Sequence, residues 1–174
     1  MKGTALLAFV TLQRVTELAI ASRNTKSLRR RGAYEVGAAH YPAMVALHAS
    51  WLAMLWLRGR RRPVSPLLLG SFCVLQVGRA WVLATLGARW TTRIILLPGA
   101  APIEAGPYRF VRHPNYLIVA LELPCVAFAV GLRRLALIFG GANLAMLGWR
   151  THCEDRAFAD AGAASRADIQ EPPA

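Results

Sequence analysis

Five apolar segments separated by arginine-rich loops constrain the fold of this chain more than any other feature of its sequence. They cover roughly residues 4–21, 41–57, 64–88, 115–131 and 135–149. A helix needs about 20 mostly apolar residues to cross a bilayer. Hydrophobic residues make up 55 % of the 174 residues and the mean hydropathy is +0.36, which is high for a soluble domain. We therefore predict an all-α, polytopic integral membrane protein with about five transmembrane helices.

The last two apolar segments are predicted to form a helical hairpin. Gly131, Arg133 and Arg134 stand between them and are typical of a tight turn. A short polar tail begins at Arg150. The hairpin would bring the residues before 115 and those after 149 to the same end of the bundle. We expect a single domain over residues 1–174, with a catalytic core at about 89–160.

The strong positive charge is concentrated between the apolar segments. The formal net charge is +12, but the arginines form no continuous stripe, so we expect no nucleic-acid partner. Anionic lipid headgroups favour basic loops of this kind. Loops 22–40 and 89–114, with the polar tail, hold twelve Lys and Arg, against seven on the opposite side. The excess predicts that the loops and tail are cytoplasmic, although four arginines within 58–62 oppose this orientation.

The three cysteines indicate neither a metal site nor a disulfide framework. Cys73, Cys125 and Cys153 are too far apart in sequence for a CxxC motif, and two of them lie inside apolar segments. We expect no bound metal.

Several polar side chains interrupt the apolar segments. Arg14 and Glu17 lie three residues apart on one helix face, where they would form an inward ion pair or the polar wall of a cavity. His40, Tyr41 and His48 are candidates for binding a substrate, because His40 and His48 are eight residues apart on roughly one face. Alternatively, His40 and Tyr41 anchor the helix at the lipid interface and His48 is a packed core histidine.

Ionisable and aromatic residues cluster at the start of the fourth apolar segment and after the fifth. The candidate site residues are Tyr108, Arg112, His113, Pro114, Asn115, Tyr116, Arg150, Glu154 and Asp155. Arginine binds a carboxylate with two hydrogen bonds, carboxylates accept from hydroxyl or ammonium groups, and aromatic rings stack on a base. Proline in a first helical turn leaves free backbone N–H groups nearby. On composition alone, these residues could instead anchor the helix at the membrane surface.

Three stretches of the sequence carry a resemblance to a known family. GPYRFVRHPNYL resembles the GxYxxxRHPxYxG stretch of the isoprenylcysteine carboxyl methyltransferase family, and RTHCEDRAF resembles its arginine followed by two acids. The segment ELAIASRNTKSLRRRGAYEVGAAHYPAMVALHASWL resembles bacterial members. Some of those accompany type III polyketide synthases and methylate alkylresorcinols or alkylpyrones. Ile118 stands where the family has glycine, and Asp155 where glutamate is usual.

The resemblance implies an S-adenosylmethionine-dependent O-methyltransferase. It implies cofactor binding by the nine candidate residues given above, with His113, Glu154 and Asp155 as candidate bases. The expected acceptor is the hydroxyl of an alkylresorcinol or alkylpyrone, which enters sideways from the bilayer and contacts His40, Tyr41 and His48. Carboxyl methylation of a prenylated cysteine is the alternative reaction. Ile118 and Asp155 depart from the family pattern, and the tail lacks the family's aromatic-rich segment. Both observations argue against a prenylated cysteine as the acceptor.

Two other classes of function remain open at this stage. One is a membrane reductase using a nicotinamide cofactor, although no further phosphate-binding cluster supports it. The other is a non-catalytic membrane scaffold with basic loops. For the enzyme, we expect the bacterial inner membrane, with the active site facing the cytoplasm. The sequence gives no indication of an oligomeric state.

Overall fold

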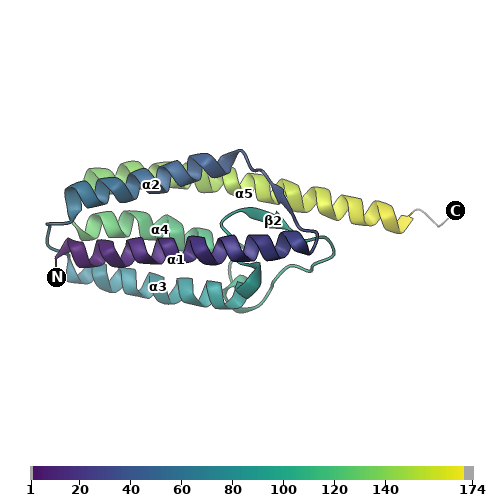
Figure 1. Ribbon diagram of the computed structural model, residues 1–174, viewed down its shortest axis with the longest axis horizontal. Coiled ribbons are helices and arrows are strands. Elements are labelled where there is room, and N and C mark those ends of the chain that lie inside the picture. The colour runs from purple at the N-terminus through teal and green to yellow at the C-terminus, as the bar shows by residue number, and fades with distance from the viewer. Residues whose placement is uncertain (1, 171–174) are drawn as a thin grey trace.

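The protein is an elongated helical bundle (Figure 1). The structure is a computed structural model that describes the fold of residues 2–170 and, within it, the side chains of residues 2–157. The five helices are α1 (Gly3–Arg30), α2 (His40–Gly59), α3 (Pro66–Leu86), α4 (Pro114–Ala129) and α5 (Arg133–Gln170). Each of the five apolar segments is therefore helical, and α5 extends past the end of the other helices (Figure 1).

The hairpin of α4 and α5 has the turn that the sequence predicts. Proline occupies the first position of α4, where its missing N–H costs no hydrogen bond. Gly131 adopts a φ of +71°, and its N–H donates to the carbonyl of Phe128 at 2.8 Å. The N–H of Leu132 donates to the carbonyl of Ala127 at 2.9 Å. This left-handed cap ends α4 and starts α5 in the opposite direction.

The first helix is longer than its apolar pattern. We predicted a loop from residue 22, but α1 continues through nine further residues to Arg30. The side-chain amide of Asn24 donates to the carbonyls of Gly87 (3.1 Å) and Trp90 (2.8 Å), and Leu28 is buried. These contacts with distant residues stabilise the polar end of α1, residues 22–30. They could not be predicted from the local sequence.

The all-α prediction misses one small sheet. Strands β1 (Tyr34–Val36) and β2 (Ile94–Leu96) pair antiparallel and join the loop after α1 to the loop after α3. Glu35 bonds Arg29 at 2.6 Å and Arg93 at 2.5 Å. Strands of three residues are too short for an alternating pattern to show, so the pairing could not be read from the sequence.

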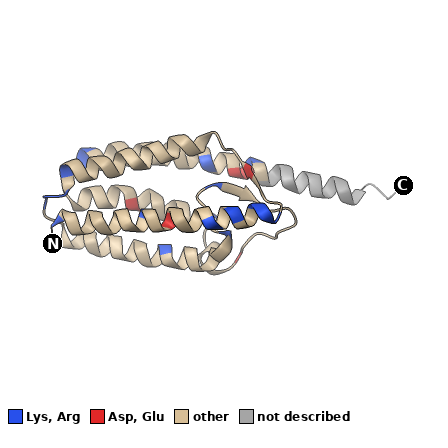
Figure 2. Ribbon diagram, viewed as in Figure 1, with Lys and Arg blue, Asp and Glu red and all other residues tan. Residues whose placement is uncertain are grey.

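The outside of the bundle is apolar, as a lipid environment requires. Several large apolar side chains are more than two-thirds exposed, namely Leu12, Leu57, Leu67, Val74, Val77, Phe110, Leu137 and Ile138. Charged residues instead gather at the two ends of the bundle, with a few inside it (Figure 2). Among the described residues, α1 and the stretch Pro66–Arg89 are long and apolar enough to span a membrane, and α4 is a shorter apolar helix.

The packed core occupies only one half of the bundle. It is formed by the beginnings of α1, α3 and α5 and the ends of α2 and α4, with fully buried Leu7, Leu55, Leu123 and Val126 among its members. These segments lie at the end of the bundle that holds the N-terminus (Figure 1). The cavity described next begins beside this core, with Trp51 in the lining of both, and extends toward the loop at 90–92.

Candidate functional site

A cavity of about 290 Å³ lies among all five helices and is also lined by the loop at 90–92. Most of its lining is apolar. Tyr41 and His48 reach it from α2, Asn115 and Tyr116 from α4, and Arg150 from α5. The structure thus brings candidates for cofactor and for substrate binding to one internal space.

Tyr116 and Arg150 form the boundary between this cavity and the two acids on α5. The hydroxyl of Tyr116 donates to Oε2 of Glu154 at 2.5 Å and accepts from Nε of Arg150 at 2.7 Å. The Nη1 of Arg150, a buried residue, donates to the carbonyl of Thr92 at 2.6 Å. The α4–α5 hairpin therefore joins the predicted residues at the mouth of α4 to the acid pair.

His113 lies in the same cluster. Its ring stacks on that of Tyr116, with centroids 5.1 Å apart and an interplanar angle of 4°. Its Nδ1 is 3.8 Å from Oε2 of Glu154 and its Nε2 is 3.9 Å from Oδ1 of Asp155. The exposed Arg112 pairs with Asp155 at 2.9 Å. Histidine, tyrosine and two acids thus surround one small region at the mouth of α4.

Two polar atoms in this region are buried and unpaired. Nε2 of His113 and Oδ1 of Asn115 have no hydrogen-bond partner within the described part of the chain. Buried polar atoms in native proteins are almost always bonded to protein, water or ligand. Burial, and after it the charge of the Glu154 carboxylate, raise the pKa of Tyr108 to about 12. Its phenol is a neutral hydrogen-bond donor at any physiological pH.

The three candidates for substrate binding separate into two groups. Tyr41 and His48 line the cavity, and the guanidinium of Arg93 lies 3.9 Å above the ring of Tyr41. His40 is buried away from the cavity lining and packs edge-on against Trp149, with centroids 6.2 Å apart. Of the expected trio, the structure brings only Tyr41 and His48 to the cavity.

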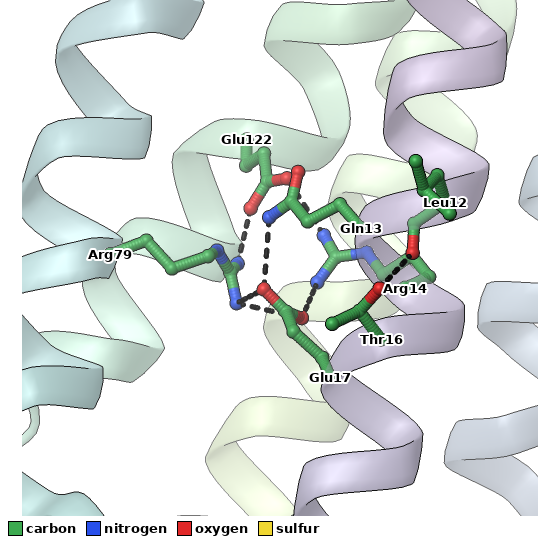
Figure 3. Close-up of polar contacts among 7 residues, drawn as sticks. All are labelled: Leu12, Gln13, Arg14, Thr16, Glu17, Arg79 and Glu122. Atoms are coloured by element: carbon green, nitrogen blue, oxygen red, sulfur yellow. Dashed lines mark hydrogen bonds and ion pairs between the residues drawn. The ribbon is translucent and has the colours of Figure 1, made fainter.

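A buried charge cluster is the feature that the sequence revealed least. It comprises Arg14 and Glu17 from α1, Arg79 from α3 and Glu122 from α4 (Figure 3). Arg14 bonds Glu17 at 3.0 Å and Glu122 at 2.9 Å, and Arg79 pairs with the same two acids. Arg14, Glu17 and Arg79 also line the cavity. Arg14 and Glu17 therefore form both an inward ion pair and part of the polar wall of a cavity.

Glu122 was not among the residues singled out from the sequence. The sequence could have indicated Glu122, because it is an acid inside the apolar segment 115–131. An ionisable residue in such a segment marks a functional site or has a buried partner of opposite charge. The loop residue Thr92, whose carbonyl binds Arg150, had no comparable signal. Across the residues with described side chains, no group of three or more His, Cys, Asp or Glu could hold a metal ion.

The fold and site together show a helical bundle with an apolar outer surface and a polar side-chain cluster beside an apolar cavity. The sequence model of the isoprenylcysteine carboxyl methyltransferase family matches residues 67–160, which include α4 and both parts of the site. The chain belongs to this family, whose members are membrane-embedded methyltransferases that use S-adenosylmethionine as methyl donor.

One curated relative is similar over most of its length. It is a Bacillus subtilis (strain 168) protein called "Uncharacterized protein YpbQ", which is 33 % identical over 159 residues. The match covers 88 % of this chain and 94 % of that protein. No solved structure matches the chain. The family assignment therefore rests on the sequence model and on this relative.

Proposed function

We propose that this protein is an S-adenosylmethionine-dependent O-methyltransferase that acts on a hydroxyl of a phenolic lipid of the alkylresorcinol or alkylpyrone type. The observation that carries this proposal is the position of Tyr116. Tyr116 lines the apolar cavity, while its hydroxyl bonds Glu154 and Arg150, which belong to the stretch that resembles the family's arginine and acid-pair motif. A polar cofactor site and a space for an apolar acceptor thus share one wall.

The residues at this wall fit the cofactor. Arg112 and Arg150 suit its carboxylate, and Glu154 and Asp155 suit the ribose hydroxyls or the ammonium group. The stacked rings of His113 and Tyr116 provide a flat apolar surface, and the unpaired atoms of His113 and Asn115 need partners. Tyr108 and Pro114 complete the proposed set. When bound, the sulfonium supplies a methyl group that is already activated for transfer.

The cavity offers the acceptor a route from the bilayer. Val15 and Leu18 of α1 and Val45 of α2 line the cavity and are also exposed on the surface of the bundle. The cavity therefore opens sideways between α1 and α2, at a level where the outer surface is apolar. A lipid tail can remain in the membrane at this opening while the head enters the cavity beside Tyr41 and His48.

A phenolic acceptor needs a group that takes its proton. With a pKa near 10, only about one phenol in a thousand is ionised at neutral pH. Of the candidate bases His113, Glu154 and Asp155, Glu154 has a hydrogen bond to a cavity-lining group, the hydroxyl of Tyr116. The acceptor proton would move to the Tyr116 oxygen while the Tyr116 proton moves to Glu154. The deprotonated acceptor oxygen could then bond to the methyl carbon as the carbon–sulfur bond of the cofactor breaks, with S-adenosylhomocysteine as the leaving group.

The orientation follows from the basic loops. The candidate site lies at the end of the bundle that holds loops 31–39 and 87–113, next to the start of the C-terminal segment. That end also carries the larger number of Lys and Arg, so the site faces the cytoplasm of a bacterium, where the cofactor is made. The protein is then an inner-membrane enzyme. Its partners are the lipid bilayer and the lipophilic acceptor.

The direct test is transfer of a labelled methyl group. Purified protein in lipid nanodiscs is incubated with methyl-labelled S-adenosylmethionine and an alkylresorcinol, and the organic phase is counted. The proposal predicts label in the organic phase, and none when both acceptor hydroxyls are already methylated. Label only with a prenylated cysteine would select carboxyl methylation. Absence of both transfer and cofactor binding would leave a membrane scaffold.

A further inference from the structure

Part of the wall of this mostly apolar cavity is polar. Arg14, Glu17 and Arg79 of the buried charge cluster belong to it, together with His48. Figure 3 shows the side chains of the cluster converging from α1, α3 and α4 inside the bundle. Buried ion pairs contribute little net stability compared with well-packed apolar residues, and ionisable groups within a membrane mark functional sites. Packing alone therefore does not account for four charges at the wall of an apolar cavity.

The arginines of this cluster retain hydrogen-bonding capacity. Nε of Arg14 and Nε of Arg79 are buried and have no hydrogen-bond partner among the described residues. The side chain of Arg79 is 5 % exposed and that of Arg14 is 17 % exposed. Because both residues line the cavity, a bound molecule is the available partner for such a donor.

His48 adds a hydrogen-bond acceptor to the polar part of the cavity wall. Its Nδ1 lies 2.9 Å from the carbonyl of Met44, which can only accept a hydrogen bond. The neutral ring therefore carries its proton on Nδ1, and Nε2 is left with a lone pair. An acceptor on His48 and a donor on Arg14 together match a hydroxyl group, which both donates and accepts.

The charges of the cluster favour a neutral ligand group. Two arginines and two glutamates balance one another, and each acid is bonded to both cations. A carboxylate placed there would compete with Glu17 and Glu122 for the same guanidinium groups. A neutral hydroxyl can be bound without breaking any of these ion pairs.

We propose that this polar part of the cavity wall binds a second hydroxyl of the acceptor, so that the substrate head is a diol with one oxygen near Tyr116 and the other between His48 and Arg14. This inference rests on the proposed methyl transfer. The lining on α5 runs from Asn143 to Arg150, seven residues or about 10 Å of helix. That length accommodates one aromatic ring with its polar substituents, and the alkyl chain leaves between α1 and α2.

The test compares two acceptors that share one alkyl chain, an alkylresorcinol and the corresponding alkylphenol with a single hydroxyl. A site built to bond a hydroxyl discriminates strongly against the analogue that lacks it. We expect kcat/KM for the diol to exceed that for the alkylphenol by about tenfold or more. His48→Phe and Arg14→Lys should lower kcat/KM for the diol more than for the alkylphenol, so that the ratio between the two acceptors falls toward one.

The matched control is Ser50→Ala, on the same helix as His48. Ser50 is exposed and bonds only backbone carbonyls of its own helix, so both acceptors should keep their wild-type rates. A structural role for His48 or Arg14 would instead lower both rates in proportion. Equal kcat/KM for the two acceptors in the wild-type protein would overturn the inference.

A binding measurement separates this inference from the proposed reaction. Trp51 and Trp90 line the cavity, so quenching of tryptophan fluorescence reports ligand binding without any methyl transfer. The inference predicts about tenfold tighter binding of the diol than of the alkylphenol, and loss of the difference in His48→Phe. Tighter diol binding without transfer would refute only the reaction. Transfer with equal binding of both ligands would refute only the diol site.

Discussion

The hydroxyl of Tyr116 lies 2.5 Å from Oε2 of Glu154, although the two residues are 38 positions apart in the chain. The same oxygen accepts a hydrogen bond from Arg150 at 2.7 Å. Hydrogen bonds with a charged partner are about twice as strong as neutral ones. This phenol therefore fixes the mouth of α4 to α5 and gives Glu154 a contact with the cavity.

Replacement of Tyr116 by phenylalanine tests that role. Tyr116→Phe keeps the ring that stacks on His113 but loses both hydrogen bonds. Each charge-assisted bond contributes about 1.5–3 kcal/mol and two are lost, so we expect a loss of at least about a hundredfold in kcat/KM for methyl transfer. The matched control is Tyr34→Phe, since Tyr34 is exposed on β1 and distant in sequence from the site. Wild-type kinetics in Tyr116→Phe would remove this residue from the mechanism.

The buried charge cluster predicts a strong dependence of stability on Glu122. Glu122→Leu leaves Arg79 and Arg14 with one acid between them, and loss of one partner from a buried pair costs about 3–5 kcal/mol. We expect a lower thermal midpoint in detergent micelles. The double variant Arg79→Leu with Glu122→Leu should lose less than the sum of the two single losses. Additive losses would show that the two side chains do not interact.

The sequence predicted those parts of the fold that depend on local pattern. Apolar segments of helical length gave the five helices, and Gly131 between two such segments gave the α4–α5 turn. That turn then accounts for the meeting of His113 and Tyr116 with Glu154, because it fixes which ends of the two helices are neighbours. Motif spacing and hairpin geometry together were enough to assemble this cluster.

The remaining features depend on contacts between distant segments. The β1–β2 pair joins residues 34–36 to 94–96, and the end of α1 is held by the contacts of Asn24 with the loop after α3. Glu122 completes a cluster whose other members come from two other helices. The local sequences around His40 and His48 do not indicate which of the two histidines faces the cavity.

The pKa of Tyr108 gives a prediction about pH. Burial and the Glu154 carboxylate raise it from about 10 to about 12 in the folded protein. Because the pKa of Tyr108 is higher in the folded than in the unfolded protein, the neutral phenol contributes to the free energy of unfolding. This contribution is complete below pH 10 and is lost as the pH rises through 12. The phenolate absorbance of wild type minus Tyr108→Phe should therefore have its midpoint near pH 12.

Glu154→Gln is the control for the cause of that shift. Removal of the carboxylate charge should lower the pKa of Tyr108 only partly, because burial is the larger cause. A midpoint near pH 10 in the wild-type protein would place Tyr108 in solvent and outside the proposed cofactor site.

The central claim is that the mouth of α4 and the acid pair of α5 bind one cofactor molecule. The most direct test is the equilibrium affinity for S-adenosylmethionine in lipid nanodiscs of wild type, His113→Ala and Glu154→Ala, with membrane insertion checked for each. Glu104→Ala, in an exposed loop, is the matched control. We predict that wild type and the control bind equally, and that both site variants lose at least about tenfold in affinity. Unchanged affinity in both site variants would contradict the account.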